Sequence, residues 1–161
     1  MRFIEFHNQD LFTIEKQLYK NGNIIIPKAH CISCDFKLGA GIACEMNKKY
    51  HVKDYLYEYF DPWNSCNYFI NNGGRCLYIH NDECNVFNLV TKYHYYNKPT
   101  YKNLEKALLD MKRNTDYWNI AEVAMPAIGC GLDRLSYNKV SEIIKEIFKY
   151  TCLNIYMCLK D

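Results

Sequence analysis

The chain is 161 residues long, with 49% hydrophobic, 16% aromatic and 24% charged residues. This length fits one domain, and this composition is typical of a packed globular protein and excludes a disordered one. The formal net charge of +2, from 20 basic and 18 acidic side chains, excludes a uniformly basic surface that would hold a nucleic-acid backbone by charge alone. We therefore predict a single domain over residues 1–161.

The cysteines and the N-terminal residues bear on the compartment. Nine cysteines are present, and their odd number and irregular spacing argue against a closed disulfide framework, which favours a reducing compartment. Residues 1–5 lack the apolar stretch of a signal peptide, and nowhere do about eighteen apolar residues run together. We expect an intracellular protein without membrane association and, given the small net charge, a monomer.

The first half of the chain contains short strands and helices. Residues 3–6 alternate apolar and polar side chains, and the apolar run over residues 24–32 is typical of a strand covered on both faces. Between residues 40 and 59, apolar residues at roughly helical spacing predict two short helices that meet at a turn. The stretch over residues 60–75 holds Asp-Pro, Asn-Asn and Gly-Gly pairs, and we expect it to be a loop.

In the second half, strands and helices alternate. Strands are predicted over 76–79 and 86–90, joined by a polar turn, and further strands over 120–125 and 153–159. A helix is predicted to begin after Pro99, with Thr100 as its cap and a buried stripe of Leu104, Ala107, Leu108 and Met111. A second helix is predicted over 140–148, with Ser136 placed to cap it. This alternation favours an α/β sheet with helices on both faces.

Two glycine-containing loops each join a predicted strand to a predicted helix, over residues 37–43 and 126–135. Small residues there let backbone amides face an anion, although glycine also occurs wherever a tight turn is needed. Ligands of open α/β sheets gather beyond the carboxyl ends of the strands, and two such loops at one edge favour a diphosphate with a sugar on either side. Neither loop matches the Walker or the full dinucleotide pattern, which argues against a kinase or a dehydrogenase.

Five segments, in order along nearly the whole chain, carry a resemblance to a known family. They are Asp10-Leu11-Phe12, residues 29–33 with 39–43, Asn88 to Lys92, Lys98 to Tyr101, and Met125 to Leu135. The chain resembles a macrodomain, and more closely the terminal ADP-ribose protein glycohydrolase branch, which includes the DNA ADP-ribosyl glycohydrolase antitoxins. The resemblance implies a three-layer α/β/α fold with a mixed central sheet, ADP-ribose as ligand, and no cofactor.

The resemblance also implies the site residues. In similar hydrolases a lysine at the position of Lys92 attacks the anomeric carbon of the distal ribose, and an aspartate at the position of Asp133 helps to release the adduct. An amine attacks only when neutral, so a nearby carboxylate that takes its proton makes chemical sense. The implied ligand-binding residues are Asp10, Leu11, Ser33, Gly39, Ala40, Gly41, Ile42, Thr91, Pro126, Ile128, Gly129, Cys130, Gly131 and Leu132. Among them, Asp10 would accept a hydrogen bond from the adenine amino group, and Ser33 would lie near the distal ribose.

Each site residue also has a purely structural interpretation. Lys92 is compatible with an ordinary surface lysine at a strand end, Asp133 with a turn or helix cap, and Asp10 with the start of a turn. The spacing Cys31-x-x-Cys34 suggests zinc or redox chemistry, but no second cysteine pair follows at zinc-ribbon spacing. We therefore predict no metal site.

The predicted function is hydrolysis that removes ADP-ribose from a conjugate, either a glutamate-linked protein, O-acetyl-ADP-ribose or a modified DNA base. The alternative is a reader that binds ADP-ribose and turns nothing over, and the presence of both Lys92 and Asp133 favours the enzyme. The aromatic and basic stretch over residues 93–98 is either a rim loop or a surface for single-stranded nucleic acid, which keeps ADP-ribosylated DNA open as a substrate. Cys158 falls where related domains often place an aromatic ring against adenine.

Overall fold

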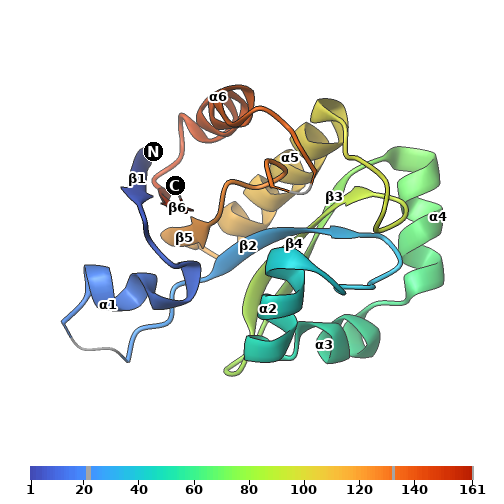
Figure 1. Cartoon of the computed structure of the whole chain (residues 1–161), viewed down its shortest axis with the longest axis horizontal. Helices are drawn as coiled ribbons and strands as arrows, with labels where there is room; N and C mark the ends of the chain where they lie inside the picture. The colour runs from blue at the N-terminus through green and yellow to red at the C-terminus, as the bar shows by residue number, and fades with distance from the viewer. Residues whose placement is uncertain (21–22, 132, 161) are drawn as a thin grey trace.

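A computed structural model describes residues 1–20, 23–131 and 133–160, and its centre is a six-stranded sheet in the order β1-β6-β5-β2-β4-β3 (Figure 1). The strands are β1 (Arg2–His7), β2 (Lys28–Ser33), β3 (Arg75–His80), β4 (Asn85–Lys92), β5 (Glu122–Met125) and β6 (Asn154–Leu159). The helices are the 3₁₀ turn η1 (Leu11–Thr13), α1 (Ile14–Leu18), α2 (Gly41–Tyr50), α3 (Val52–Tyr59), α4 (Pro62–Asn72), α5 (Tyr101–Tyr117) and α6 (Tyr137–Phe148).

The sheet is mixed, as predicted. β1, β6, β5, β2 and β4 run parallel to their neighbours, whereas β3 pairs with β4 in antiparallel register. The predicted polar turn joins β3 to β4, and the side-chain oxygen of Asn81 accepts hydrogen bonds from the N–H groups of Glu83 and Cys84. Because the parallel strands share one direction, their carboxyl ends meet at one edge of the sheet.

Helices cover both faces of the sheet and complete the three-layer α/β/α architecture (Figure 1). α5 and α6 pack on one face, and the predicted stripe of α5, formed by Leu104, Ala107, Leu108 and Met111, is fully buried there. α1, α2, α3 and part of α4 pack on the other face. Across the described ranges, no helix combines the length and the apolar character needed to cross a membrane.

The prediction of a loop over residues 60–75 is wrong, because α4 occupies most of it. Asp61 is the N-cap of α4, and its carboxylate accepts a hydrogen bond from the N–H of Asn64 at 3.0 Å. Pro62 occupies the first helical position, where a backbone N–H has no partner within the helix, so the N–H that proline lacks is not needed. Gly73 ends the helix with a φ of 84°, which glycine adopts without strain. The turn-forming pairs therefore mark the two ends of a helix.

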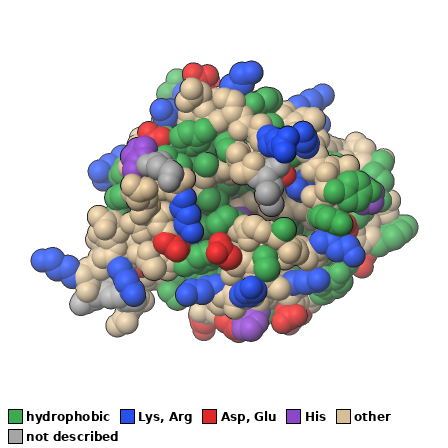
Figure 2. Space-filling model, in the orientation of Figure 1, with side chains coloured by type: hydrophobic (Ala, Val, Ile, Leu, Met, Phe, Trp, Pro, Cys, Tyr) green, Lys and Arg blue, Asp and Glu red, His purple; other side chains and the backbone are tan. Residues whose placement is uncertain are grey.

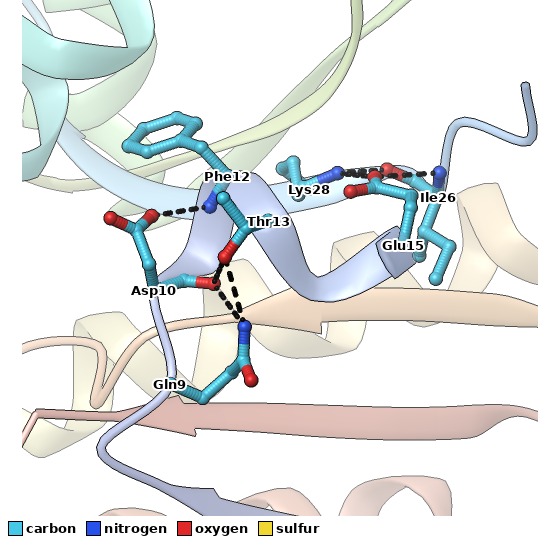
Figure 3. Close-up of polar contacts among 7 residues, drawn as sticks. All are labelled: Gln9, Asp10, Phe12, Thr13, Glu15, Ile26 and Lys28. Atoms are coloured by element: carbon cyan, nitrogen blue, oxygen red, sulfur yellow. Dashed lines mark hydrogen bonds and ion pairs between the residues drawn. The ribbon is translucent and has the colours of Figure 1, made fainter. Parts of the chain in front are cut away.

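The predicted strand over residues 24–32 is too long, because β2 begins only at Lys28. Ile24 and Ile25 are 46% and 57% exposed. Pro27 cannot donate to a strand partner, and only its carbonyl enters the sheet, where it accepts from the N–H of Ala124. Lys28 is 1% exposed, and its ammonium group donates to the Glu15 carboxylate and to the carbonyl of Ile26 (Figure 3). A buried ion pair thus starts the strand and holds α1 against it.

The two predicted caps behave differently. The hydroxyl of Thr100 accepts a hydrogen bond from the N–H of Asn103 at 3.1 Å and caps α5 as expected. Ser136 occupies the N-cap position of α6, but its side chain makes no capping bond. Its N–H instead donates to the hydroxyl of Tyr101 at 2.9 Å. This bond ties the end of the second glycine loop to the start of α5.

Candidate functional site

A cavity of about 860 Å³ opens at the edge where the parallel strands end. Its volume lies within the range of about 300–1,000 Å³ that small-molecule sites occupy. The segments after β1, β2, β4 and β5 and the end of β6 form its walls. Of the residues that the sequence assigned to the site, the cavity brings together Asp10, Leu11, Ser33, Gly39, Ala40, Gly41, Ile42, Lys92, Pro126, Ile128, Gly129, Cys130, Gly131 and Asp133.

The two remaining assigned residues do not belong to this set. Thr91 is 1% exposed and lies beside Cys31, outside the cavity lining. Thr91 and Lys92 are neighbours on β4, so their side chains point to opposite faces of the sheet, and of the two only Lys92 lines the cavity. Leu132 lies outside the described residues.

Lys92 and Asp133 form an ion pair in the cavity wall. The ammonium nitrogen of Lys92 lies 2.7 Å from Oδ1 of Asp133, and the two side chains are 14% and 16% exposed. Lys92 is the last residue of β4, whereas Asp133 comes from the loop after β5, so the fold brings together two groups that are 41 residues apart. At this distance the carboxylate can take a proton from the ammonium and leave a nucleophilic amine.

Ser33 lies alongside Lys92 at the end of β2. The register between β2 and β4 shifts between Ile32 and Ser33, which pairs Ser33 with Lys92. Such an irregularity re-aims a side chain at the end of a strand. The Ser33 hydroxyl donates to Oδ1 of Asp35 at 2.5 Å, and the N–H of Cys34 donates to the carbonyl of Lys92 at 2.9 Å. Sequence reasoning did not single out Asp35, because a carboxylate in a loop carries no pattern of its own.

The first glycine loop leaves the N-terminus of α2 open. The N-cap of this helix is Ala40, whose side chain offers no acceptor to the first N–H groups of α2. Gly41 has a φ of 59°, and the exposed Gly39 leaves open space where a Cβ would stand. The positive end of the helix dipole and these N–H groups suit an anion in the cavity.

The second glycine loop is held by its own backbone. The N–H of Leu135 donates to the carbonyl of Gly129 at 2.7 Å, and the N–H of Arg134 donates to that of Gly131 at 3.2 Å. Gly129 has a φ of 72°, and a Cβ there would lie 2.9 Å from a methyl carbon of Leu135. A larger residue would therefore both strain the backbone and displace Leu135.

Asp10 follows β1, lines the cavity and contacts the start of η1 (Figure 3). Its Oδ1 accepts a hydrogen bond from the N–H of Phe12 at 2.7 Å, so it caps η1 in the manner of the structural interpretation. Its Oδ2 lies 4.0 Å from the Lys160 ammonium, and the side chain is 47% exposed. One carboxylate oxygen therefore caps η1, and the other lies near the ammonium group of Lys160. Cys158 lines the same region, where burial raises the pKa of its thiol to about 12, which keeps it neutral.

Curated proteins with a similar sequence carry one shared name. The human ADP-ribose glycohydrolase OARD1 is 37% identical over 128 residues, which cover 79% of this chain and 77% of the relative. The protein of the same name from Bos taurus is 37% identical over 127 residues, with 78% and 76% covered. This chain belongs to the macrodomain ADP-ribose glycohydrolases. Membership makes it a hydrolase and confirms the family that the sequence resemblance predicted, although no family model matches the chain.

Solved structures support the same fold. The macrodomain of DarG from Mycobacterium tuberculosis aligns with a TM-score of 0.64 at 18% identity, over 82% of this chain and 87% of that one. A macrodomain protein from Streptomyces coelicolor gives 0.64 at 13% identity, over 98% of each chain. DarTG from Thermosipho africanus, solved in complex with ADP-ribose, gives 0.64 at 17% identity, over 86% of this chain and 39% of that one.

This macrodomain also has cavity residues to which sequence reasoning gave no role in the site, and His30 is the clearest of them. Burial lowers the pKa of His30 to about 4, so its ring is neutral near pH 7. The side-chain amide of Asn88 donates to the carbonyls of Leu77 and Val86, which turns its oxygen toward Nε2 of His30 at 2.6 Å. Nε2 must therefore carry the ring proton. A histidine within an apolar strand was the one available signal.

Proposed function

We propose that this macrodomain hydrolase releases ADP-ribose from a conjugate with Lys92 as nucleophile and Asp133 as acid and base. The contact of 2.7 Å between their charged groups, within the wall of a cavity of about 860 Å³, supports this proposal most directly. A lysine that served only solubility would not be expected to stand 14% exposed against a carboxylate from a distant loop.

The proposed reaction uses each group twice. Asp133 takes a proton from Lys92, and the neutral amine attacks the anomeric carbon of the distal ribose. The bond from that carbon to the leaving group breaks, its electron pair departs with the leaving group, and Asp133 returns the proton to it. Asp133 then activates a water molecule that displaces the lysine from the adduct. The balance is one conjugate and one water consumed, with ADP-ribose and the protonated leaving group formed.

The rest of the cavity would bind and orient ADP-ribose. The open N-terminus of α2 and the backbone amides between Gly129 and Gly131 are suited to the diphosphate. Oδ2 of Asp10, which does not cap η1, is suited to the adenine amino group, and Ser33, held by Asp35, to the distal ribose. Holding the ribose at the amine would account for much of the rate, because correct positioning removes a large entropic barrier.

For the leaving group, we propose a protein carboxylate as the first candidate and a base in DNA as the second. Tyr95 and Tyr96 favour the second, since they line the cavity after β4 and are 61% and 67% exposed. Exposed aromatic rings stack on single-stranded bases, with a gain of about 1–3 kcal/mol for each base. The cations Lys98 and Arg134 stand at the same rim. Figure 2 shows basic side chains interleaved with acidic ones on this face, so a DNA contact would be local.

The decisive experiment measures turnover and binding together. Wild type, Lys92→Ala and Asp133→Asn are assayed on glutamate-linked ADP-ribosyl protein, O-acetyl-ADP-ribose and ADP-ribosylated single-stranded DNA, and ADP-ribose binding is measured by calorimetry. We expect both variants to bind ADP-ribose and to turn over at least about 10²-fold more slowly, as the loss of an acid-base group predicts. If all three proteins bind equally and none hydrolyses any conjugate, the protein is a reader.

The leaving group is tested by a second pair of variants. Tyr95→Ala with Tyr96→Ala is expected to slow turnover of modified DNA and to leave O-acetyl-ADP-ribose turnover unchanged. The exposed Tyr150 lies outside the cavity lining, so Tyr150→Ala is the matched control. Equal turnover of DNA by the double variant and by the control would argue for the protein carboxylate.

A further inference from the structure

Two cysteine sulfurs lie in contact outside the lining of the cavity. Sγ of Cys34, in the turn just after β2, lies 2.8 Å from Sγ of Cys66, in the middle of α4, although the two residues are 32 positions apart. Both are free thiols. Bridging two cysteines requires that their backbones already hold the sulfurs within reach, and this pair meets that condition.

A metal does not explain this contact. A structural zinc site uses four ligands, usually cysteine and histidine side chains. Within the described ranges, no group of three or more histidine, cysteine, aspartate and glutamate side chains is arranged around a common point. The pair also belongs to no part of the proposed hydrolysis, because neither Cys34 nor Cys66 lines the cavity.

The two thiols differ in their access to solvent. Cys34 is fully buried, and burial together with its hydrogen bond to Cys66 raises the pKa of its thiol well above the usual range. Cys34 therefore keeps its proton near pH 7. Cys66 is only partly buried, on the outer helix, and is the sulfur that a dissolved oxidant reaches first.

We propose that Cys34 and Cys66 are an oxidative modification site that hydroperoxides convert to an intramolecular disulfide. The Cys66 thiol gives up its proton and its sulfur attacks one oxygen of the hydroperoxide, the O–O bond breaks, and the departing oxygen takes up that proton to leave as alcohol or water, with Cys66 oxidised to the sulfenic acid. The Cys34 sulfur then attacks the Cys66 sulfur, the S–S bond forms, and the hydroxide departs with the Cys34 proton as water. Two electrons pass from the thiol pair to the peroxide.

Oxidation also reaches the active site through Tyr93. The thiol of Cys34 lies 3.2 Å from the carbonyl oxygen of Tyr93 and 2.8 Å from Sγ of Cys66, and its single S–H can donate to either of them. Tyr93 directly follows Lys92 and begins the segment that carries Tyr95 and Tyr96 to the cavity rim. A disulfide has no S–H, so its formation leaves this carbonyl without that donor. This consequence rests on the proposed function, whereas the disulfide itself does not.

The chemical test needs no activity assay. Reduced protein is treated with one equivalent of hydrogen peroxide, free thiols are alkylated, and peptides are mapped without reduction. We expect a Cys34–Cys66 crosslink, loss of two of the nine thiols, and recovery of both with dithiothreitol. The exposed Cys152 provides the matched control, since Cys152→Ser keeps the crosslink and Cys66→Ser abolishes it. Cys66 that accumulates as sulfinic or sulfonic acid, or remains fully alkylated while Cys152 oxidises, overturns the proposal.

Stability and turnover provide two further readouts. Closing the segment between the two cysteines is expected to raise the melting temperature by about 5–10 °C, and dithiothreitol reverses the rise. In the oxidised wild type, KM for an ADP-ribosylated peptide is expected to rise by a factor of about 2 to 10, as the loss of one hydrogen bond implies. Peroxide-treated Cys66→Ser keeps the KM of its untreated form. A crosslink that forms without any change in KM overturns the link through Tyr93 and leaves the modification site standing.

Discussion

Buried His30 is expected to make the protein lose stability in mild acid. The ring is 1% exposed, and burial lowers its pKa from 6.5 to about 4, against the opposing effect of the hydrogen bond with Asn88. Between these two values the unfolded chain binds a proton and the folded chain does not. The contribution of His30 is therefore fully present above pH 6.5 and is lost as the pH falls toward 4.

The size of this loss follows from the two pKa values. A difference of about 2.5 between the two pKa values corresponds to about 3 kcal/mol of unfolding free energy, since one pKa unit is worth about 1.36 kcal/mol. A domain of this size has a total free energy of unfolding of about 5–15 kcal/mol, so one side chain removes a large share of it. Burial favours the neutral ring, because the side-chain oxygen of Asn88 accepts a hydrogen bond from the imidazole but supplies no counter-charge for an imidazolium.

Urea unfolding, followed by tryptophan fluorescence, measures the loss at a series of pH values from 7 to 4. His30→Gln is the matched variant, since its amide can still donate to the side-chain oxygen of Asn88 and does not titrate. We expect the wild type to lose about 3 kcal/mol more than the variant over this range. The carboxylates titrate in both proteins and cancel in the difference. Identical pH dependence of the two proteins would refute the reasoning.

Two further predictions concern the buried ion pair and the helix caps. Glu15→Gln leaves buried Lys28 without its counter-charge and is expected to lower the free energy of unfolding by about 3 kcal/mol. Glu15→Leu combined with Lys28→Met is expected to leave the free energy of unfolding nearly unchanged. A double variant as unstable as the single one would contradict this prediction. Thr100→Ala removes a capping hydrogen bond and is expected to lower the free energy of unfolding by about 1 kcal/mol. Ser136→Ala removes no capping bond and is expected to lower it by less than about 0.5 kcal/mol. Urea midpoints check both pairs, and equal costs at the two caps would show that the hydroxyl of Thr100 is not what stabilises α5.

The elements that the sequence predicts well are those with an apolar stripe. The spacing of buried residues along α5 identifies both the helix and its inner face, because tertiary packing follows the same period. α4 has no such stripe. Its one fully buried residue is Ser65, while Trp63 and Ile70 are 73% and 64% exposed. This helix is defined by its two ends, and the capping signals at Asp61 and Gly73 were present in the sequence but were interpreted as turns.

Other features depend on contacts that no local pattern contains. The ion pair that starts β2 joins Lys28 to Glu15 through the fold, so an apolar run next to it looks like a longer strand than it is. The bond between Ser33 and Asp35 depends on the irregular end of β2. The resemblance also assigns both Thr91 and Lys92 to the site, whereas only Lys92 lines the cavity, because the two side chains alternate along β4.

The open end of α2 gives a last prediction, in which stability and binding move in opposite directions. α4 and α5 begin with side chains that bond the first N–H groups, whereas α2 begins with Ala40, which bonds none. Ala40 is exposed, and Ala40→Asp supplies a capping acceptor and a favourable charge at the start of α2. We expect the variant to gain about 1 kcal/mol in unfolding free energy and to lose ADP-ribose affinity, because its carboxylate occupies the donors and repels the diphosphate. Ala40→Gly is the control that adds no charge and no acceptor. A variant that gains stability and binds ADP-ribose as well as wild type would show that α2 does not hold the diphosphate.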